Sequence, residues 1–182
     1  MRIACLGWGS LIWDPRDLPI EREWFLDGPF APVEFRRKSS DGRITLVIDP
    51  EAASVRVLWA HMLPADLPAA KEALRRREGL TSREWERDIR AWKSGHTAPD
   101  TIPDLPIWAK AHGLDAAIWT ALGPRLDDAA SPSADQVIDY LSGLTGPAKD
   151  AAERYIRCAP RQIDTEYRRK IEAALGWSHR PC

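Results

Sequence analysis

The first fifteen residues contain a loop whose composition suits the binding of an anion. A predicted buried strand at residues 2–6 leads into five residues that we treat as one candidate binding element: Gly7, Trp8, Gly9, Ser10 and Leu11. Glycine adopts backbone angles that other residues avoid, so consecutive N–H groups can converge on one ligand. A carboxylate or a phosphate suits such a loop, and the Ser10 hydroxyl could add a hydrogen bond. The alternative is a tight turn in which Trp8 and Trp13 pack as core.

Glu78 occupies a helical position where an apolar side chain is expected. On a helical wheel for residues 65–78, one face carries Leu67, Ala70 and Leu74. Glu78 lies four residues beyond Leu74 on the same face. A shielded carboxyl group at a helix C-terminus keeps its proton to higher pH, as a general base near neutral pH requires. The alternative is an ion pair with Arg75 or another arginine at a frayed helix end.

Several familiar motifs are absent from the sequence. Gly7-Trp8-Gly9 begins like a dinucleotide fingerprint, but Ile12 occupies the position of the third glycine. Ser10 lacks the flanking residues of a nucleophile elbow, and no His-Glu-x-x-His pattern is present. The three cysteines are odd in number and far apart: Cys5, Cys158 and Cys182. We therefore expect no disulfide framework, no metal and no nucleotide cofactor.

Composition and charge exclude several classes of protein. The 182 residues are 44% hydrophobic and 29% charged, which excludes a disordered chain and favours one globular domain with an appended lobe. The net charge is −1, from 26 basic and 27 acidic side chains. A nucleic-acid or anionic-membrane partner usually requires an excess of Lys and Arg. We therefore expect neither partner.

The N-terminal stretch bears on cellular location. The apolar residues 3–13 are interrupted by Gly7 and Gly9 and are not followed by a small-residue cleavage site, so they differ from a signal peptide. No apolar run approaches the roughly 20 residues that span a bilayer. We expect a cytoplasmic protein.

The predicted strands are short and lie mainly in the first third of the chain. They are residues 2–6, 33–37, 44–48, 55–62 and 116–122. The run at 55–62 keeps strand alternation only in part, so we expect it to be buried on both faces. A helix is predicted at 65–78, with Asp66 as its cap and Gly79 at its end.

Further helices are predicted after residue 80. Thr81 and Glu84 form a capping box for a helix that carries Trp85, Ile89 and Trp92. Residues 94–107 predict a long loop, which together with the neighbouring Trp92 and Trp108 could cover a site or serve in packing. Three C-terminal helices are indicated by a capping box at Ser133 and Gln136, by Gly146-Pro147, and by a cap at Thr165.

These elements show few β-α-β alternations, which favours an α+β fold. We expect a small mixed or antiparallel β-sheet, or a partial β-barrel, with flanking helices. Residues 1–130 are predicted to form the main domain. Residues 131–182 are predicted to form a C-terminal helical extension packed on that same domain.

Two of the motifs resemble those of a known family. Gly-Trp-Gly-Ser-Leu-Ile-Trp-Asp-Pro at residues 7–15 is similar to the Tyr-Gly-Ser-Leu-Ile-Trp-x-Pro loop of the ChaC-type γ-glutamylcyclotransferases. Leu-Arg-Arg-Arg-Glu at residues 74–78 resembles the Leu-x-x-Arg-Glu that carries the family's catalytic acid. Residues 35–43 resemble a further ChaC segment more loosely. Order and spacing agree over residues 3–80, although Trp8 replaces the family's tyrosine, and the helices from residue 133 match no family segment.

The resemblance implies a cofactor-independent enzyme. Such enzymes cleave a γ-glutamyl amide by attack of the substrate's own α-amine on its γ-carbonyl, which releases 5-oxoproline and an amine or peptide. The backbone N–H groups of Gly9, Ser10 and Leu11 would hold the α-carboxylate of the glutamyl unit. Glu78 would take a proton from the α-ammonium group and later deliver one to the leaving nitrogen.

Two other functions remain open at this point. One is a non-catalytic module on the same scaffold that binds a small metabolite or peptide. The other is a related acyl-transfer or lyase reaction on a non-glutamyl substrate. Neither the particular γ-glutamyl compound nor the oligomeric state follows from the sequence.

Overall fold

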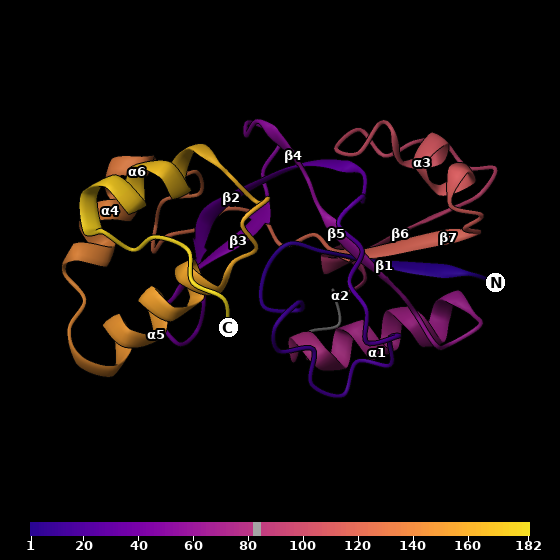
Figure 1. The fold of residues 1–182 in the computed structure, drawn as a ribbon, viewed down its shortest axis with the longest axis horizontal. Coiled ribbons are helices and arrows are strands. Elements are labelled where there is room, and N and C mark those ends of the chain that lie inside the picture. Colours follow the sequence, from indigo (N-terminus) through magenta and orange to yellow (C-terminus); the bar gives the residue numbers. More distant parts are fainter. Residues whose placement is uncertain (82–84) are drawn as a thin grey trace. The chain divides into compact units, whose positions relative to one another are not determined.

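A computed structural model describes residues 1–81 and 85–182 of the chain. The fold is α+β, as predicted, and its strands and helices are labelled in Figure 1. The chain forms two compact units, each built from separate stretches. The first unit comprises Met1–Gly7, Asp14–Ala31 and Arg56–Leu122. The second unit comprises Trp8–Trp13, Pro32–Val55 and Gly123–Cys182.

The first unit is built on a four-stranded sheet with the order β5-β1-β7-β6. Its strands are β1 (Ile3–Gly7), β5 (Leu58–His61), β6 (Ile89–Lys93) and β7 (Ala116–Thr120). β1 pairs antiparallel with β5 and parallel with β7, and β6 pairs antiparallel with β7. All five residues of β1 are buried, which explains why its sequence is continuously apolar.

Three helices belong to the first unit: α1 (Leu67–Glu78), α2 (Trp85–Asp88) and α3 (Leu105–Ala111). α1 begins and ends as its sequence predicts. The Asp66 carboxylate accepts a hydrogen bond from the Ala69 N–H (2.8 Å), and Gly79 ends the helix in the left-handed conformation (φ 67°). α1 packs against β6 and β7, and its buried residues are Ala70, Leu74 and Arg77.

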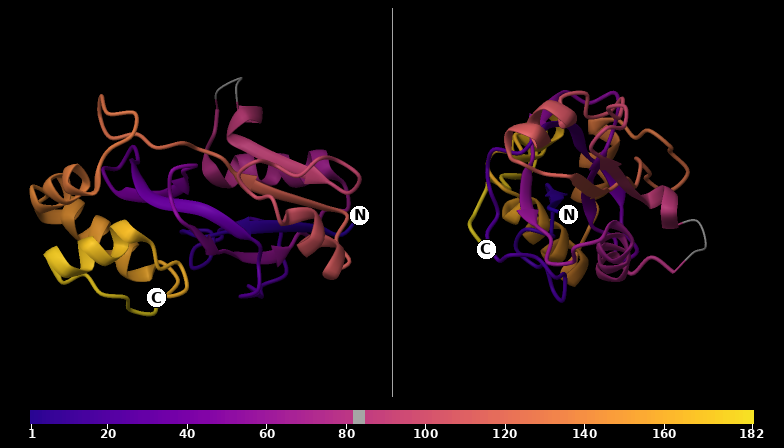
Figure 2. Two further views of the ribbon diagram at one scale, coloured as in Figure 1. Left: turned by 90° about the horizontal axis from the view of Figure 1, so that it is seen from above. Right: turned by 90° about the vertical axis from the view of Figure 1, so that its right-hand side faces the viewer.

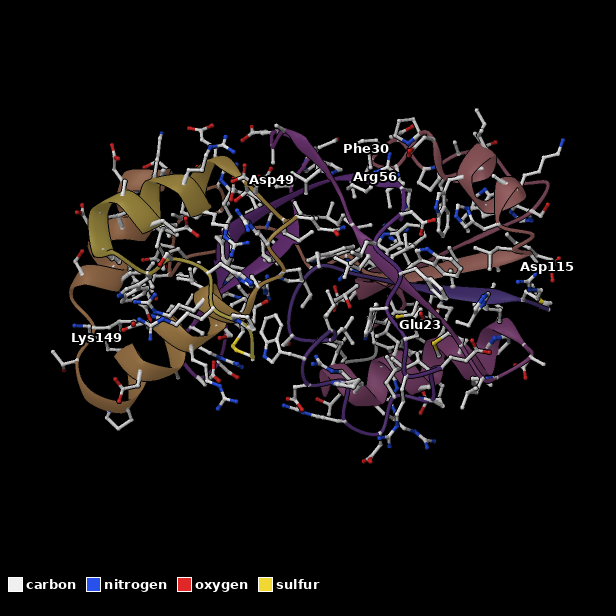
Figure 3. The ribbon with its side chains drawn as sticks, viewed as in Figure 1. Glu23, Phe30, Asp49, Arg56, Asp115 and Lys149 are labelled. Atoms are coloured by element: carbon white, nitrogen blue, oxygen red, sulfur yellow. A yellow bond between two sulfur atoms is a disulfide. The ribbon has the colours of Figure 1, made fainter. Side chains whose placement is uncertain are left out.

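The segment that precedes β2 (Phe30–Lys38) is hydrogen-bonded to the segment that follows β4 (Ser54–Arg56). The Val57 N–H donates to the Pro29 carbonyl (3.0 Å), and an added side chain at Gly28 would collide with the Val57 carbonyl oxygen. The Arg56 guanidinium lies over the Phe30 ring at 4.6 Å from its centre, and Figure 3 shows the two side chains next to each other.

A three-stranded sheet with the order β3-β2-β4 forms the framework of the second unit. Its strands are β2 (Phe30–Lys38), β3 (Ile44–Ile48) and β4 (Ser54–Arg56). β2 and β3 pair antiparallel, with an irregularity between Phe35 and Arg37. The described strands thus form two sheets rather than a closed barrel.

The second unit also contains α4 (Ala134–Ser142), α5 (Gly146–Cys158) and α6 (Glu166–Leu175), which are grouped together in the left-hand view of Figure 2. α4 packs on α6, and α5 packs on β3. The predicted capping box of α4 is confirmed, because the Ser133 hydroxyl and the Gln136 side chain bind each other's backbone N–H groups. Thr165 caps α6 as predicted.

Three predictions of secondary structure are wrong. The run at 55–62 divides into β4 and β5, which belong to different sheets, and β4 is largely exposed. The helix predicted to carry Ile89 and Trp92 is only the single turn α2, and residues 89–93 form β6. Pairing of every residue of β6 with β7 overrides the helical spacing of the apolar side chains.

The loop predicted at 94–107 ends early, because α3 begins at Leu105. Glu84, half of the predicted capping box, lies outside the described residues.

The cysteine count and spacing predicted no disulfide framework, but the structure contains a disulfide that the sequence analysis did not predict. Cys158, at the end of α5, is bonded to Cys182 across a sequence separation of 24 residues. The third cysteine, Cys5, is a buried free thiol in β1. The odd count therefore reflects one core residue and one covalent pair.

Helix length and hydropathy bear on membrane association. Within residues 1–81 and 85–182, none of the helices combines the length and the apolar character of a membrane span.

Candidate functional site

The predicted binding loop folds as a turn in the second unit. The Ile12 N–H donates to the Gly9 carbonyl (3.1 Å). The Trp8 side chain is 5% exposed, and its indole N–H donates to the Leu46 carbonyl of β3 (3.3 Å). Trp8 therefore belongs to the core, as the alternative interpretation of the loop proposed. Leu11 is also buried.

Tyr155 of α5 holds this loop and was not found by the sequence analysis. Its ring meets the Trp13 ring edge-on, with 5.3 Å between the ring centres, and its hydroxyl accepts a hydrogen bond from the Leu46 N–H (3.4 Å). A side chain added at Gly9 would collide with the same hydroxyl. Gly9 is thus required by the close approach of Tyr155. The only sequence signal was an aromatic residue on the apolar face of a helix, which indicates packing more often than a site.

Gly7 is the one residue of the predicted binding element that lies in the first unit. It ends β1 and pairs with Leu58 of β5. Asp14, which follows the loop in sequence, also belongs to the first unit. The residues on both sides of the loop are therefore anchored in the first unit.

Glu78 is the last residue of α1, and its side chain is 18% exposed. Its carboxylate forms an ion pair with Arg77 at 3.0 Å. The alternative interpretation named Arg75 or another arginine as the partner. Arg75 instead binds Glu72 (2.6 Å), so Arg77 provides the pair. The carboxylate is shielded but reachable from solvent.

The buried thiol of Cys5 shows where the Glu78 charge acts. Burial, together with a smaller contribution from the nearby negative charge of Glu78, raises the pKa of Cys5 to about 12, while Arg77 opposes this effect. The Glu78 carboxylate is therefore within electrostatic range of the middle of β1. Cys5 itself stays protonated at neutral pH and is not a nucleophile in this state.

A second carboxylate of the first unit, Asp27, lies among aromatic side chains. Its carboxylate accepts hydrogen bonds from the Trp59 indole (2.9 Å) and the His112 ring (3.1 Å). The backbone carbonyl of Asp27 accepts a hydrogen bond from the Trp108 indole (2.8 Å). The bonds from Trp59 and His112 lower the pKa of Asp27. Trp108 is 7% exposed and serves in packing here.

A cavity of about 360 Å³ in the second unit is lined mainly by charged residues that bind one another. Arg36 forms a buried ion pair with Asp49. Glu34 accepts hydrogen bonds from the Thr165 hydroxyl and the Tyr167 N–H, and burial raises its pKa. These hydrogen bonds and this ion pair give Glu34, Arg36 and Asp49 a structural role. In the part of the chain that the structure describes, no three His, Cys, Asp or Glu side chains are grouped as metal ligands.

The chemistry open to Glu78 is proton transfer. A partly shielded carboxylate can accept a proton and return it, whereas the thiol of Cys5 is held in its protonated form by burial.

Comparisons with known proteins give one kind of match. No protein-family model matches the chain, and no curated protein matches it. Among solved structures, a γ-glutamyl cyclotransferase specific to glutathione from yeast is similar, with a TM-score of 0.51 and 15% sequence identity. The match covers 98% of this chain and 100% of the yeast chain. At this identity the likeness concerns the fold, which is similar to that of a γ-glutamylcyclotransferase.

Proposed function

We propose that this protein is a γ-glutamylcyclotransferase that releases 5-oxoproline from a γ-glutamyl amide or peptide. The observation that carries the proposal is Glu78, a carboxylate with 18% exposure at the end of α1, in a chain that has this type of fold. The loop motif at residues 7–15 supports the same proposal.

In the proposed reaction the substrate supplies its own nucleophile. Glu78 removes a proton from the α-ammonium group, and the freed amine attacks the γ-carbonyl carbon to close a five-membered lactam. The bond between that carbon and the amide nitrogen then breaks, and Glu78 returns the proton to the leaving nitrogen. The lactam nitrogen gives its second proton to the released amine, which departs as an ammonium group. No redox step occurs, and the reaction itself needs no cofactor. Holding the amine against the carbonyl accounts for several kcal/mol of the barrier.

The loop is proposed to bind the glutamyl end of the substrate. Backbone N–H groups of Gly9, Ser10 and Leu11 would hold the α-carboxylate. Gly7 and Trp8 would shape the loop without contacting the reacting atoms, because Gly7 is part of β1 and the Trp8 indole is engaged with Leu46. Trp8 supplies no counterpart to the hydroxyl of the family's tyrosine.

Substrate class, domain organisation and location complete the proposal. The substrate is a small γ-glutamyl compound, and glutathione is the first to test because the yeast protein is specific to it. Residues 131–182 are proposed to serve the same domain as residues 1–130, which the position of Tyr155 against Gly9 supports. A cytoplasmic location stays a prediction, and the Cys158–Cys182 bond is the feature that weighs against it.

The decisive experiment measures 5-oxoproline release from a panel of γ-glutamyl compounds, including glutathione. The wild-type protein should turn over at least one, and Glu78→Gln should abolish release while the fold is kept. Glu72→Gln is the matched control, because Glu72 lies on the same helix and forms its ion pairs with Arg75 and Arg76. Unchanged turnover in Glu78→Gln contradicts the role of Glu78. A compound that raises the melting temperature without being converted indicates a binding module instead.

A further inference from the structure

We propose that Arg77 is a positioning residue that holds the Glu78 carboxylate in its working orientation. This inference rests on the proposed function, in which Glu78 transfers the proton. Arg77 lies directly before Glu78 in α1, and its side chain is 6% exposed. One guanidinium nitrogen is 3.0 Å from the Glu78 carboxylate.

Arg77 differs from the two arginines that precede it. Arg75 and Arg76 both bind Glu72, at 2.6 Å and 2.8 Å, and the Arg76 side chain is 75% exposed. These contacts belong to the solvated face of α1. A guanidinium with 6% exposure loses most of its hydration, and its contacts with neighbouring groups, the Glu78 carboxylate among them, replace that hydration.

A second contact fixes the Arg77 side chain from the other side. Its other terminal nitrogen donates to the carbonyl oxygen of Asp14 at 2.7 Å. Asp14 follows the loop residues 8–13 in sequence, and both contacts lie within the first unit. One planar group thus binds the proposed general acid/base and the backbone next to the proposed binding loop.

The guanidinium geometry explains why arginine suits this position. Its nitrogens are held rigidly in one plane, so the contact to Asp14 determines where the group can meet the carboxylate. A lysine carries the same charge on a single nitrogen and cannot span the two contacts in the same way. The Glu78 side chain is thereby restricted in orientation, which a proton transfer to a defined atom requires.

The inference predicts an effect on the chemical step rather than on binding. In Arg77→Met the carboxylate loses its fixed partner, and kcat should fall between about 10- and 100-fold while KM changes little. Arg77→Lys should retain more of kcat than Arg77→Met does, because lysine keeps the positive charge. It should not reach the wild-type kcat, because its single nitrogen cannot bind both Glu78 and Asp14. Arg76→Met is the matched control and should leave both constants at wild-type values, since Arg76 binds Glu72 on the exposed face.

A double-mutant cycle separates positioning from a general structural role. In a Glu78→Asp background the carboxylate is already displaced, so adding Arg77→Met should lower kcat by a smaller factor than it does in the wild type. If Arg77→Met lowers kcat by the same factor in both backgrounds, the inference is overturned and Arg77 has only a general structural role. If Arg77→Met does not fold, Arg77→Lys is carried through the same cycle, and a wild-type kcat for folded Arg77→Lys also overturns it.

The outcomes distinguish this inference from the proposed function. If the wild type releases no 5-oxoproline from any γ-glutamyl compound, or if Glu78→Gln retains full turnover, the proposed function fails and the inference fails with it. If the wild type is active, Glu78→Gln is inactive and Arg77→Met retains wild-type kcat, only the role of Arg77 is wrong.

Discussion

Two carboxylates of the first unit, Asp27 and Glu78, are held in opposite ways. Asp27 is 63% exposed and yet binds the Trp59 indole and the His112 ring, which lower its pKa. Glu78 is 18% exposed and forms an ion pair with the guanidinium of Arg77. The exposed carboxylate is thus bound by aromatic side chains, whereas the shielded one is bound by a buried guanidinium. Exposure alone therefore does not separate the proposed general acid from a carboxylate that serves in packing.

Exchanging the two carboxylates for amides should give the largest contrast. Glu78→Gln should lower 5-oxoproline release by about 10²–10⁴-fold, because general acid–base catalysis contributes that much. Its melting temperature should change little. Asp27→Asn should keep turnover and lower stability by about 1 kcal/mol, because it weakens hydrogen bonds at a mostly exposed group. Turnover and thermal unfolding of both variants check the contrast, and a reversal of the two patterns contradicts it.

Removal of the disulfide between Cys158 and Cys182 should change stability and leave turnover unchanged. Cys182→Ser opens a link that spans 24 residues, and should lower the free energy of unfolding by about 3 kcal/mol. Turnover at 25 °C should stay at the wild-type value. Thermal unfolding with and without reductant measures the effect.

Thiol counting provides the control for that experiment. Reductant should lower the melting temperature of the wild type and leave that of Cys182→Ser unchanged. Denatured wild-type protein prepared without reductant should titrate one thiol, that of Cys5. Three titrated thiols would show that the bond does not form.

Gly9 is the position where stability and binding should change together. Gly9→Ala places a methyl group against the Tyr155 hydroxyl, which should cost about 1–3 kcal/mol and raise KM because the loop shifts. Tyr155→Phe removes the colliding oxygen, so the double variant should recover part of both losses. Thermal unfolding and KM test this, and a double variant as impaired as the sum of the two single variants contradicts the collision.

The smallest expected effect is a pH dependence at Asp27. Partial burial lowers the pKa of His112, but hydrogen bonds to the Trp108 carbonyl and the Asp27 carboxylate outweigh this effect, so the pKa is raised overall. A raised folded-state pKa stabilises the fold below the unfolded value, about 6.5, and this contribution is lost as pH rises through the folded value. Because Asp27 is exposed, the contribution should stay below about 1 kcal/mol.

Comparison with His112→Gln isolates that contribution. The difference in unfolding free energy between the wild type and His112→Gln should be largest between about pH 4 and 6, where Asp27 is ionised and His112 is protonated. It should shrink toward pH 8. A difference that grows with pH would contradict the assignment of the charged pair.

Local signals were sufficient to predict part of the fold and of the candidate site. The limits of α1 follow from Asp66 and Gly79, and the Ser133 capping box fixes the start of α4, because these contacts lie within a few residues in sequence. The position of Glu78 on the packed side of α1 followed from the same helix. Long-range contacts were not predictable in this way. Pairing with β7 turned residues 89–93 into a strand, and the Tyr155 contact with the loop joins residues far apart in sequence.

The Arg77 contacts show the same limit on a smaller scale. Three consecutive arginines at 75–77 look alike in sequence, and only the fold buries one of them and exposes another. Cysteine pairing was mispredicted for a related reason, because spacing in sequence does not reveal that the end of α5 meets the last residue.

The thiol of Cys5 offers an intrinsic spectroscopic probe of the proposed reaction. Its S–H bond persists through the physiological range, since its pKa is raised to about 12, and it lies within the field of Glu78. The infrared stretching band of a buried S–H group is well separated from protein absorption and shifts with the local electric field. Gain or loss of a proton at Glu78 should therefore be visible as a frequency change, without any added label.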